Sequence, residues 1–127
     1  MSERPGRDAV LCAYVALWTE ADLARRRALV ETSLHEDCEI LGRRYRFHGH
    51  AEVMAEVSRF LRDDPGYRPV VTSGFDAVGR WVRFTIAVLD PEGFEVNTGW
   101  DVIEMADDGR IARVLTFWGP LALPPPA

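Results

Sequence analysis

Residues 94–119 predict two β-strands joined by a tight turn, and this stretch constrains the fold more than any other part of the chain. Asp107, Asp108 and Gly109 form the expected turn, because Asp tolerates turn geometry and Gly adopts positive φ without steric cost. The flanking residues are rich in Val, Ile, Phe, Thr and Trp, which favour strands. Because the turn is short, the two strands are expected to be antiparallel neighbours in a sheet.

Asp101 does not fit the pattern of this hairpin, because it lies mid-strand between Trp100 and Val102. A carboxyl group in such surroundings is costly unless it is hydrogen-bonded, paired with a cation or protonated. Asp101 is therefore the first candidate for a functional residue. Since side chains alternate along a strand, one face is expected to carry Asn97, Gly99, Asp101 and Ile103, and the other Val96, Thr98, Trp100 and Val102.

Upstream of the hairpin, the hydrophobic pattern predicts three helices followed by further strands. Asp8 and Asp22 are candidate N-caps of the first two helices, and His50 is a candidate cap of the third. Residues 63–66 end the third helix, because Pro and Gly stop helices. Helices followed by long antiparallel strands are typical of an α+β fold. Strands are expected at residues 38–41, 68–75, 80–89, 94–105 and 111–118, with residues 44–47 forming a hairpin partner of the first strand or a loop.

The chain has 127 residues, which is the size of one domain. Residues 1–7 are polar and contain Pro and Gly, and they predict a disordered N-terminus. Residues 8–119 are expected to form the folded domain. Residues 120–127 are Pro-rich and cannot continue a central strand, so they predict an extended C-terminal tail.

Several classes of protein are disfavoured by the composition. No apolar run approaches the length of a membrane span, and the first ten residues lack the layout of a secretory signal, so no membrane association is expected. Cys12 and Cys38 are the only cysteines, which favours a reducing cytoplasm over a disulfide framework. The net charge is −5 and the basic residues are scattered, which argues against nucleic-acid binding.

The arginine run at residues 25–27 could suggest an anion site, but three consecutive arginines on a helix point in three directions. We expect them on a solvated face. His48 and His50 stand two residues apart, yet no helical or Cys-rich spacing supports zinc. No metal site is therefore expected, and no motif indicates a cofactor.

Three segments follow a known pattern: Tyr-Val-Ala-Leu at 14–17 with Asp-Leu at 22–23, the run at 34–40, and an ending of strand, Asp-Asp-Gly-Arg-Ile, strand and Phe-Trp-Gly. Over residues 8–119 the chain resembles the NTF2-like superfamily, in particular its SnoaL-like group. The resemblance implies a cystatin-like α+β cone, with about three N-terminal helices packed on a curved antiparallel sheet around an apolar pocket. The superfamily contains isomerases, cyclases, dehydratases, epoxide hydrolases and binding domains, so the fold does not name the reaction.

Ketosteroid isomerases of this superfamily have an oxyanion hole made of a Tyr on the first helix and an Asp on a late strand. Alignment through the Tyr-Val-Ala segment places Tyr14 at the first position, and alignment through the final hairpin places Asp101 at the second. The general base of those enzymes aligns with Gly42, which cannot abstract a proton. His48 could replace that base, because imidazole titrates near neutrality; the alternative is an exposed loop histidine.

Asp101 and Tyr14 each have a structural alternative. Asp101 could be a pocket acid or base, or a buried residue that fixes the sheet through a backbone amide or an arginine such as Arg44 or Arg83. Without an arginine nearby, we expect Asp101 to be neutral near pH 7. Tyr14 could donate to a developing oxyanion or simply pack in the core. Candidates for the apolar lining of the pocket, or for simple core, are Trp18, Phe84, Ile86, Ile103 and Trp118.

Two functions remain open from the sequence. The first is a cofactor-independent general acid–base enzyme, isomerase-, cyclase- or dehydratase-like, that acts on a small hydrophobic carbonyl or polyketide-like compound. The second is a non-catalytic module that binds an apolar ligand or docks on a partner. Trp100, Val102 and Phe117 are expected on the outer face of the sheet, where they would form an apolar patch, so a homodimer through this face is predicted.

Overall fold

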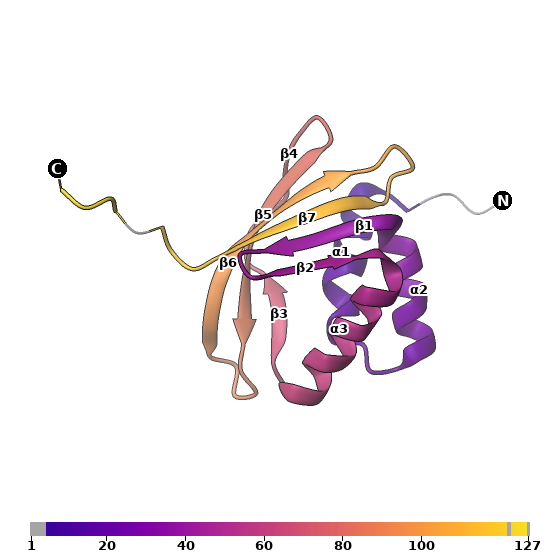
Figure 1. Cartoon of the computed structure of the whole chain (residues 1–127), viewed down its shortest axis with the longest axis horizontal. Helices are drawn as coiled ribbons and strands as arrows, with labels where there is room; N and C mark the ends of the chain where they lie inside the picture. Colours follow the sequence, from indigo (N-terminus) through magenta and orange to yellow (C-terminus); the bar gives the residue numbers. More distant parts are fainter. Residues whose placement is uncertain (1–4, 122, 127) are drawn as a thin grey trace.

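The computed structural model describes residues 5–121 and 123–126, which fold into three helices packed on one curved sheet (Figure 1). The N-terminal half supplies the helices and strands β1 and β2, and the C-terminal half supplies the other strands. The helices are α1 (Arg7–Leu17), α2 (Leu23–Ser33) and α3 (Gly49–Asp63). The strands are β1 (Leu34–Gly42), β2 (Tyr45–His48), β3 (Arg68–Val71), β4 (Asp76–Val78), β5 (Trp81–Leu89), β6 (Glu95–Met105) and β7 (Ile111–Trp118).

The sheet is open and has the strand order β2-β1-β7-β6-β5-β3, with β4 also paired to β5. Every strand pair is antiparallel except β1 and β7, which run parallel, so the sheet is mixed rather than purely antiparallel. A long stretch of chain separates β1 from β7, so no short turn forces these two strands to be antiparallel. The expected α+β cone, with the helices on the concave face of the sheet, is confirmed (Figure 1).

The helix starts differ in part from the sequence-based expectation. Asp22 caps α2 as predicted, and its side chain accepts a hydrogen bond from the Arg25 backbone N–H at 2.9 Å. Asp8 lies inside the first turn of α1, where a carboxylate also suits the helix dipole. His48, not His50, is the N-cap residue of α3. His50 lies within the helix, and one of its ring nitrogens hydrogen-bonds the Leu34 carbonyl at 2.8 Å.

The arginine run at 25–27 is not uniformly solvated, which corrects the sequence-based expectation. Arg26 is only 3% exposed. Its Nε atom donates to the Glu20 carbonyl at 2.8 Å, and its Nη1 atom donates to the Ser58 hydroxyl at 2.7 Å. Arg26 therefore ties α2 both to the loop before it and to α3, and it has a structural role.

The alternation predicted for β6 is confirmed by burial. Asp101 and Ile103 point into the core, whereas Trp100 is 44% exposed on the outer face. Gly99 lies on the inner face, where an added Cβ would collide with the Phe117 carbonyl on β7. No helix among the described residues has both the length and the apolar character that a membrane crossing requires.

Candidate functional site

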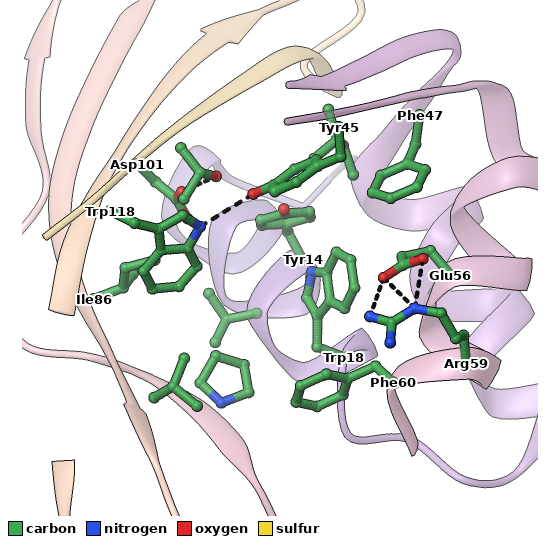
Figure 2. Close-up of a pocket in the computed structure, with 15 residues that line it drawn as sticks. Tyr14, Trp18, Tyr45, Phe47, Glu56, Arg59, Phe60, Ile86, Asp101 and Trp118 are labelled. Carbon is green, nitrogen blue, oxygen red and sulfur yellow. Dashed lines mark hydrogen bonds and ion pairs between the residues drawn. The ribbon is translucent and has the colours of Figure 1, made fainter. Parts of the chain in front are cut away.

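A cavity of about 220 Å³ lies between the inner face of the sheet and helices α1 and α3 (Figure 2). Most of its wall is apolar, and aromatic rings contact one another within it. Tyr14 and Trp18 meet edge to face at 6.4 Å between ring centroids, and Trp18 and Phe60 do so at 6.2 Å. The lining residues are Tyr14, Val15, Trp18, Ile40, Tyr45, Phe47, Glu56, Arg59, Phe60, Pro69, Ile86, Val88, Asp101, Thr116 and Trp118.

Asp101 lies in the cavity wall and is only 4% exposed. Its Oδ1 atom accepts a hydrogen bond from the Thr116 hydroxyl on β7 at 2.7 Å. Neither arginine named as a possible partner reaches it. Arg83 pairs with Asp76 at 2.8 Å and covers the exposed Trp100 ring, and Arg44 is exposed in the turn between β1 and β2. The carboxyl group is therefore buried without a cation.

Burial raises the pKa of Asp101 to about 6, and the hydrogen bond from Thr116 offsets part of that rise. The expected direction of the shift is found. Its size differs from the expectation, because a carboxyl group with a pKa of about 6 is mostly ionised at pH 7. Asp101 thus combines a predominantly charged resting state with a proton affinity well above that of an ordinary carboxylate.

Tyr14 presents its hydroxyl group to the same cavity from α1. The side chain is 4% exposed, and its hydroxyl oxygen accepts a hydrogen bond from the Trp18 side chain. Burial raises the pKa of Tyr14 well above its ordinary value, the charge of Asp101 raises it further, and the hydrogen bond from Trp18 lowers it in part. Tyr14 is therefore a neutral phenol at all physiological pH values, with a proton available for donation.

Tyr45, on β2, is a cavity residue that sequence reasoning missed. Its ring lies over Gly42, where an added Cβ would stand only 2.7 Å from the Tyr45 hydroxyl oxygen. That oxygen accepts a hydrogen bond from Trp118 Nε1 at 3.2 Å (Figure 2). Gly42, which aligns with the catalytic base of ketosteroid isomerases, thus leaves room for a phenol. The signal in the sequence was the Gly-Arg-Arg-Tyr turn, which brings the two residues face to face.

Glu56 and Arg59, on α3, were also missed, and they form an ion pair in the cavity wall. Glu56 follows Val53 by three residues and precedes Phe60 by four, so it lies on the apolar stripe of the helix. A charged residue on such a stripe is the signal that could have identified it. Thr116 carried no comparable signal, because a Thr is ordinary in a strand.

Of the residues predicted to form the site, the cavity brings together Tyr14, Asp101, Trp18 and Trp118, and it also includes Ile86. Two others, Phe84 and Ile103, are fully buried in the core and do not line the cavity.

His48 is exposed at the end of β2, outside the cavity wall, because alternation along β2 turns Phe47 inward and His48 outward. Its backbone N–H donates to the Glu52 side chain at 3.0 Å, as expected at a helix start. Within the described residues, no group of three His, Cys, Asp or Glu side chains is placed to hold a metal ion.

Comparison with solved structures identifies similar folds. A proposed isomerase of the SnoaL-like family from Agrobacterium tumefaciens has a TM-score of 0.82 and 29% identity, over 90% of this chain and 97% of that one. A proposed polyketide cyclase from Sinorhizobium meliloti has a TM-score of 0.67 and 16% identity, over 85% and 93%. An NTF2-like protein of unknown function from Cytophaga hutchinsonii has a TM-score of 0.70 and 12% identity, over 94% and 96%.

These neighbours confirm the resemblance to SnoaL-like and NTF2-like proteins and the α+β cone. The second and third show the fold alone, since their identities are low. No protein-family model and no curated protein matches the sequence.

Proposed function

We propose that this NTF2-like protein is a cofactor-independent acid–base enzyme that moves a proton on a small hydrophobic carbonyl compound. One observation carries the proposal. Asp101 is a buried carboxylate with no cation partner, its pKa is raised to about 6, and it shares a mainly apolar cavity with the Tyr14 hydroxyl. A base works best when its pKa lies near the operating pH, and burial brings Asp101 into that range.

In this mechanism Asp101 removes a proton from the carbon next to the substrate carbonyl. The electron pair of the broken C–H bond moves into the carbonyl, and negative charge develops on its oxygen. Tyr14 donates a hydrogen bond to that oxygen, and a donor that is already in place stabilises the charge without reorganisation. Because the pKa of Tyr14 is raised, the phenol donates a hydrogen bond and does not transfer its proton fully.

Tyr45 supplies a second donor in the proposed mechanism. Its oxygen accepts the Trp118 N–H, and its own O–H proton has no acceptor among the described side chains. A hydroxyl group that accepts one hydrogen bond becomes a better donor. The protonated Asp101 then returns its proton to the same carbon or to a different carbon of the enolate. The second outcome is an isomerisation, and both outcomes restore the Asp101 carboxylate.

The test is α-proton exchange of β-tetralone, a bicyclic ketone, in deuterated buffer followed by NMR. The wild-type chain is expected to accelerate deuterium incorporation above the buffer rate. Asp101→Asn should reduce the rate by about 10²–10⁴-fold, because an amide cannot abstract the proton. Tyr14→Phe should reduce it by about 10²–10³-fold through loss of an oxyanion donor.

Asp76→Asn is the matched control, because this carboxylate is exposed and pairs with Arg83 away from the cavity. Its exchange rate should equal that of the wild-type chain. If β-tetralone binds but exchanges only at the buffer rate, the catalytic proposal is wrong.

A second candidate function is a ligand-binding module without catalysis. Gly42 favours it, because the position that aligns with a catalytic base in ketosteroid isomerases carries no side chain. The same β-tetralone experiment separates the two functions. A binding module would bind β-tetralone, and the wild-type chain and every variant would show exchange only at the buffer rate.

A further inference from the structure

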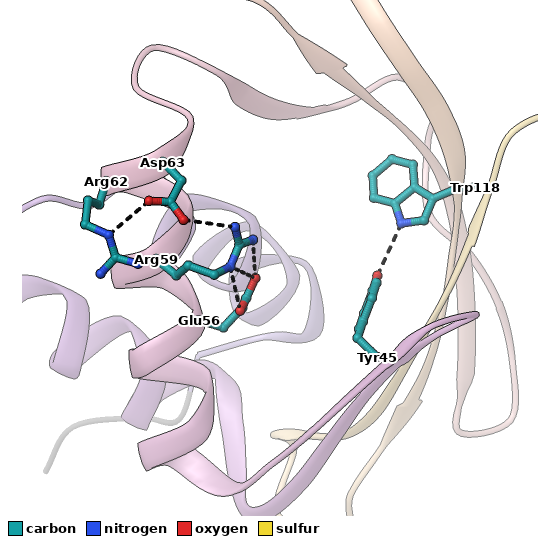
Figure 3. Close-up of polar contacts among 6 residues, drawn as sticks. All are labelled: Tyr45, Glu56, Arg59, Arg62, Asp63 and Trp118. Atoms are coloured by element: carbon teal, nitrogen blue, oxygen red, sulfur yellow. Dashed lines mark hydrogen bonds and ion pairs between the residues drawn. The ribbon is translucent and has the colours of Figure 1, made fainter.

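A charged pair on α3, Glu56 and Arg59, lies in the wall of the mostly apolar cavity. The Arg59 Nε atom donates to the two Glu56 carboxylate oxygens at 2.9 and 3.0 Å, and its Nη2 atom also donates to Oε1. Figure 3 shows this pair on the side of α3 that faces Tyr45 and Trp118, whereas Arg62 points away from them. The mechanism described above makes no use of the pair.

The environment of the pair differs from that of a solvated ion pair on a helix surface. The Glu56 side chain is only 15% exposed, and Arg59 is 45% exposed. Phe60, Trp18 and Phe47 line the same cavity. A carboxylate beside aromatic rings loses hydration and stays charged only if a partner compensates. Arg59 provides that compensation, and the bond to Glu56 raises the pKa of the guanidinium.

Hydrogen-bond capacity remains open on both members of the pair. A carboxylate has about four acceptor sites. Arg59 uses part of this capacity, and no other described residue donates to Glu56. Arg59 has five N–H donors, of which its Nε and Nη2 atoms contact Glu56, and its Nη1 atom lies 3.6 Å from the Asp63 carboxylate. A hydroxyl group suits this pair, because it can donate to Glu56 and accept from Arg59.

The charges of the pair select a neutral donor. A ligand cation would be attracted by Glu56 and repelled by the adjacent guanidinium of Arg59, so it gains little. A ligand carboxylate would face the Glu56 carboxylate. An alcohol or phenol hydroxyl can donate to Glu56 without bringing a charge.

We propose that Glu56 and Arg59 bind a hydroxyl group at the end of the ligand opposite to its carbonyl group. Figure 2 places the pair across the cavity from Asp101. The volume of about 220 Å³ is smaller than the ~300–1,000 Å³ of typical drug-sized sites, so the ligand has one or two rings. The ligand class is therefore a small hydroxylated cyclic ketone. This inference rests on the proposed function, because it takes a ketone as the occupant.

The test measures the affinity of four β-tetralone derivatives for the full chain by titration calorimetry. The derivatives carry hydrogen, hydroxyl, carboxylate or aminomethyl at one position of the aromatic ring far from the carbonyl. For the wild-type chain, the hydroxyl derivative should bind about tenfold more tightly than the parent, as expected for a hydrogen bond to a charged acceptor. The charged derivatives should bind no more tightly than the parent.

Glu56→Ala should invert this preference. The hydroxyl derivative loses its advantage, and the carboxylate derivative becomes the tightest ligand because it takes the place of Glu56 on Arg59. Its affinity should rise about tenfold over that for the wild-type chain. Glu56→Gln keeps the size of the side chain and should lose most of the preference for the hydroxyl derivative. Its affinity for the carboxylate derivative should rise less than that of Glu56→Ala. Circular dichroism verifies that each variant is folded.

Arg62→Ala is the matched control, because Arg62 lies on the same helix and also pairs with Asp63 but does not line the cavity. It should keep the wild-type order of affinities. If the hydrogen and hydroxyl derivatives bind equally, and Glu56→Ala changes nothing, the hydroxyl site is disproved while ketone binding stands. If no derivative binds to the wild-type chain, both the hydroxyl site and the proposed function are disproved.

Discussion

Burial and one hydrogen bond together determine the pKa of Asp101. Burial alone would favour the neutral carboxyl group, and the Thr116 hydroxyl stabilises the charged form at 2.7 Å. The balance leaves a pKa of about 6. Below that pH the carboxyl group is mostly protonated, and above it the carboxylate is mostly free to accept a proton. A reaction that needs Asp101 as a base should therefore slow as the pH falls through this range.

The raised pKa of Asp101 also makes stability depend on pH. Between its unfolded value of 3.8 and its folded value of about 6, the folded state binds more protons than the unfolded state. Stability contributed by Asp101 is therefore present below about pH 4 and is lost as the pH rises to 6. The loss amounts to about 3 kcal/mol.

Urea denaturation of the wild-type chain and Asp101→Asn at pH 4 and pH 7 measures this effect. The Asn variant should gain about 2 kcal/mol relative to wild type between the two pH values, because the unfolded carboxyl group is already partly ionised at pH 4. The comparison cancels the pH dependence that other carboxylates add to stability. Hydrogen bonding to Arg62 lowers the pKa of Asp63, and the backbone N–H and side chain of Arg110 lower the pKa of Asp108. An unchanged difference between the two pH values would mean that Asp101 is solvated.

In the β1–β2 hairpin, the Tyr45 ring occupies the space next to Gly42, the position that aligns with the catalytic base of ketosteroid isomerases. Tyr45 pairs with Gly42 across the hairpin and fills the space above it. The hydrogen bond from Trp118 Nε1 then connects the hairpin to the end of β7. The hairpin therefore closes one side of the cavity.

Gly42→Ala should displace the Tyr45 ring and break its bond to Trp118. We expect a loss of about 1–3 kcal/mol, as for overpacking in a core, and a shift of the Trp118 indole N–H signal in NMR spectra. In a Tyr45→Ala background the added methyl group has space, so the same substitution should cost much less. Equal costs in the two backgrounds would show that the ring and the glycine are independent.

The elements that are local in sequence could be predicted, and those built from distant segments could not. The Asp-Asp-Gly turn and the alternation around Asp101 identified β6, β7 and their buried face. The parallel pairing of β1 with β7 had no sequence signal, because it depends on the whole sheet. Glu56 carried a local signal, a charge on the apolar stripe of α3, but only the packing of α3 against the sheet shows that it lines the cavity. Strand β4 lies between the strands expected at residues 68–75 and 80–89 and was not predicted, because three residues are too few for a recognisable pattern.

At the scale of the whole molecule, the outer face of the sheet carries exposed apolar side chains. Trp100 and Phe117 are cross-strand partners there and are 44% and 57% exposed. Val96 lies on the same face of β6 and is 53% exposed. Contiguous apolar patches of this kind commonly mark contacts between proteins.

We expect a homodimer through this outer face, with a second copy covering Trp100 and Phe117. Light scattering at micromolar concentration should give the mass of two chains. Trp100→Glu should give the mass of one chain, because two copies would bring buried charges together. Leu23→Glu, which places the same charge at an exposed apolar residue of α2, is the control and should stay dimeric. A monomeric wild-type chain would disprove the expected assembly.

The parallel contact between β1 and β7 also has a kinetic consequence. It brings together residues 74 positions apart, such as Glu39 and Arg113, whereas β5, β6 and β7 are joined by short turns. Closing so long a loop lowers the entropy of the chain before the contacts between β1 and β7 can form. We therefore expect β1 to dock after strands β5, β6 and β7 have paired. Val114→Ala, opposite Ile40, should then speed unfolding and leave the folding rate nearly unchanged in stopped-flow experiments. On this pathway the binding cavity is completed in the last step of folding.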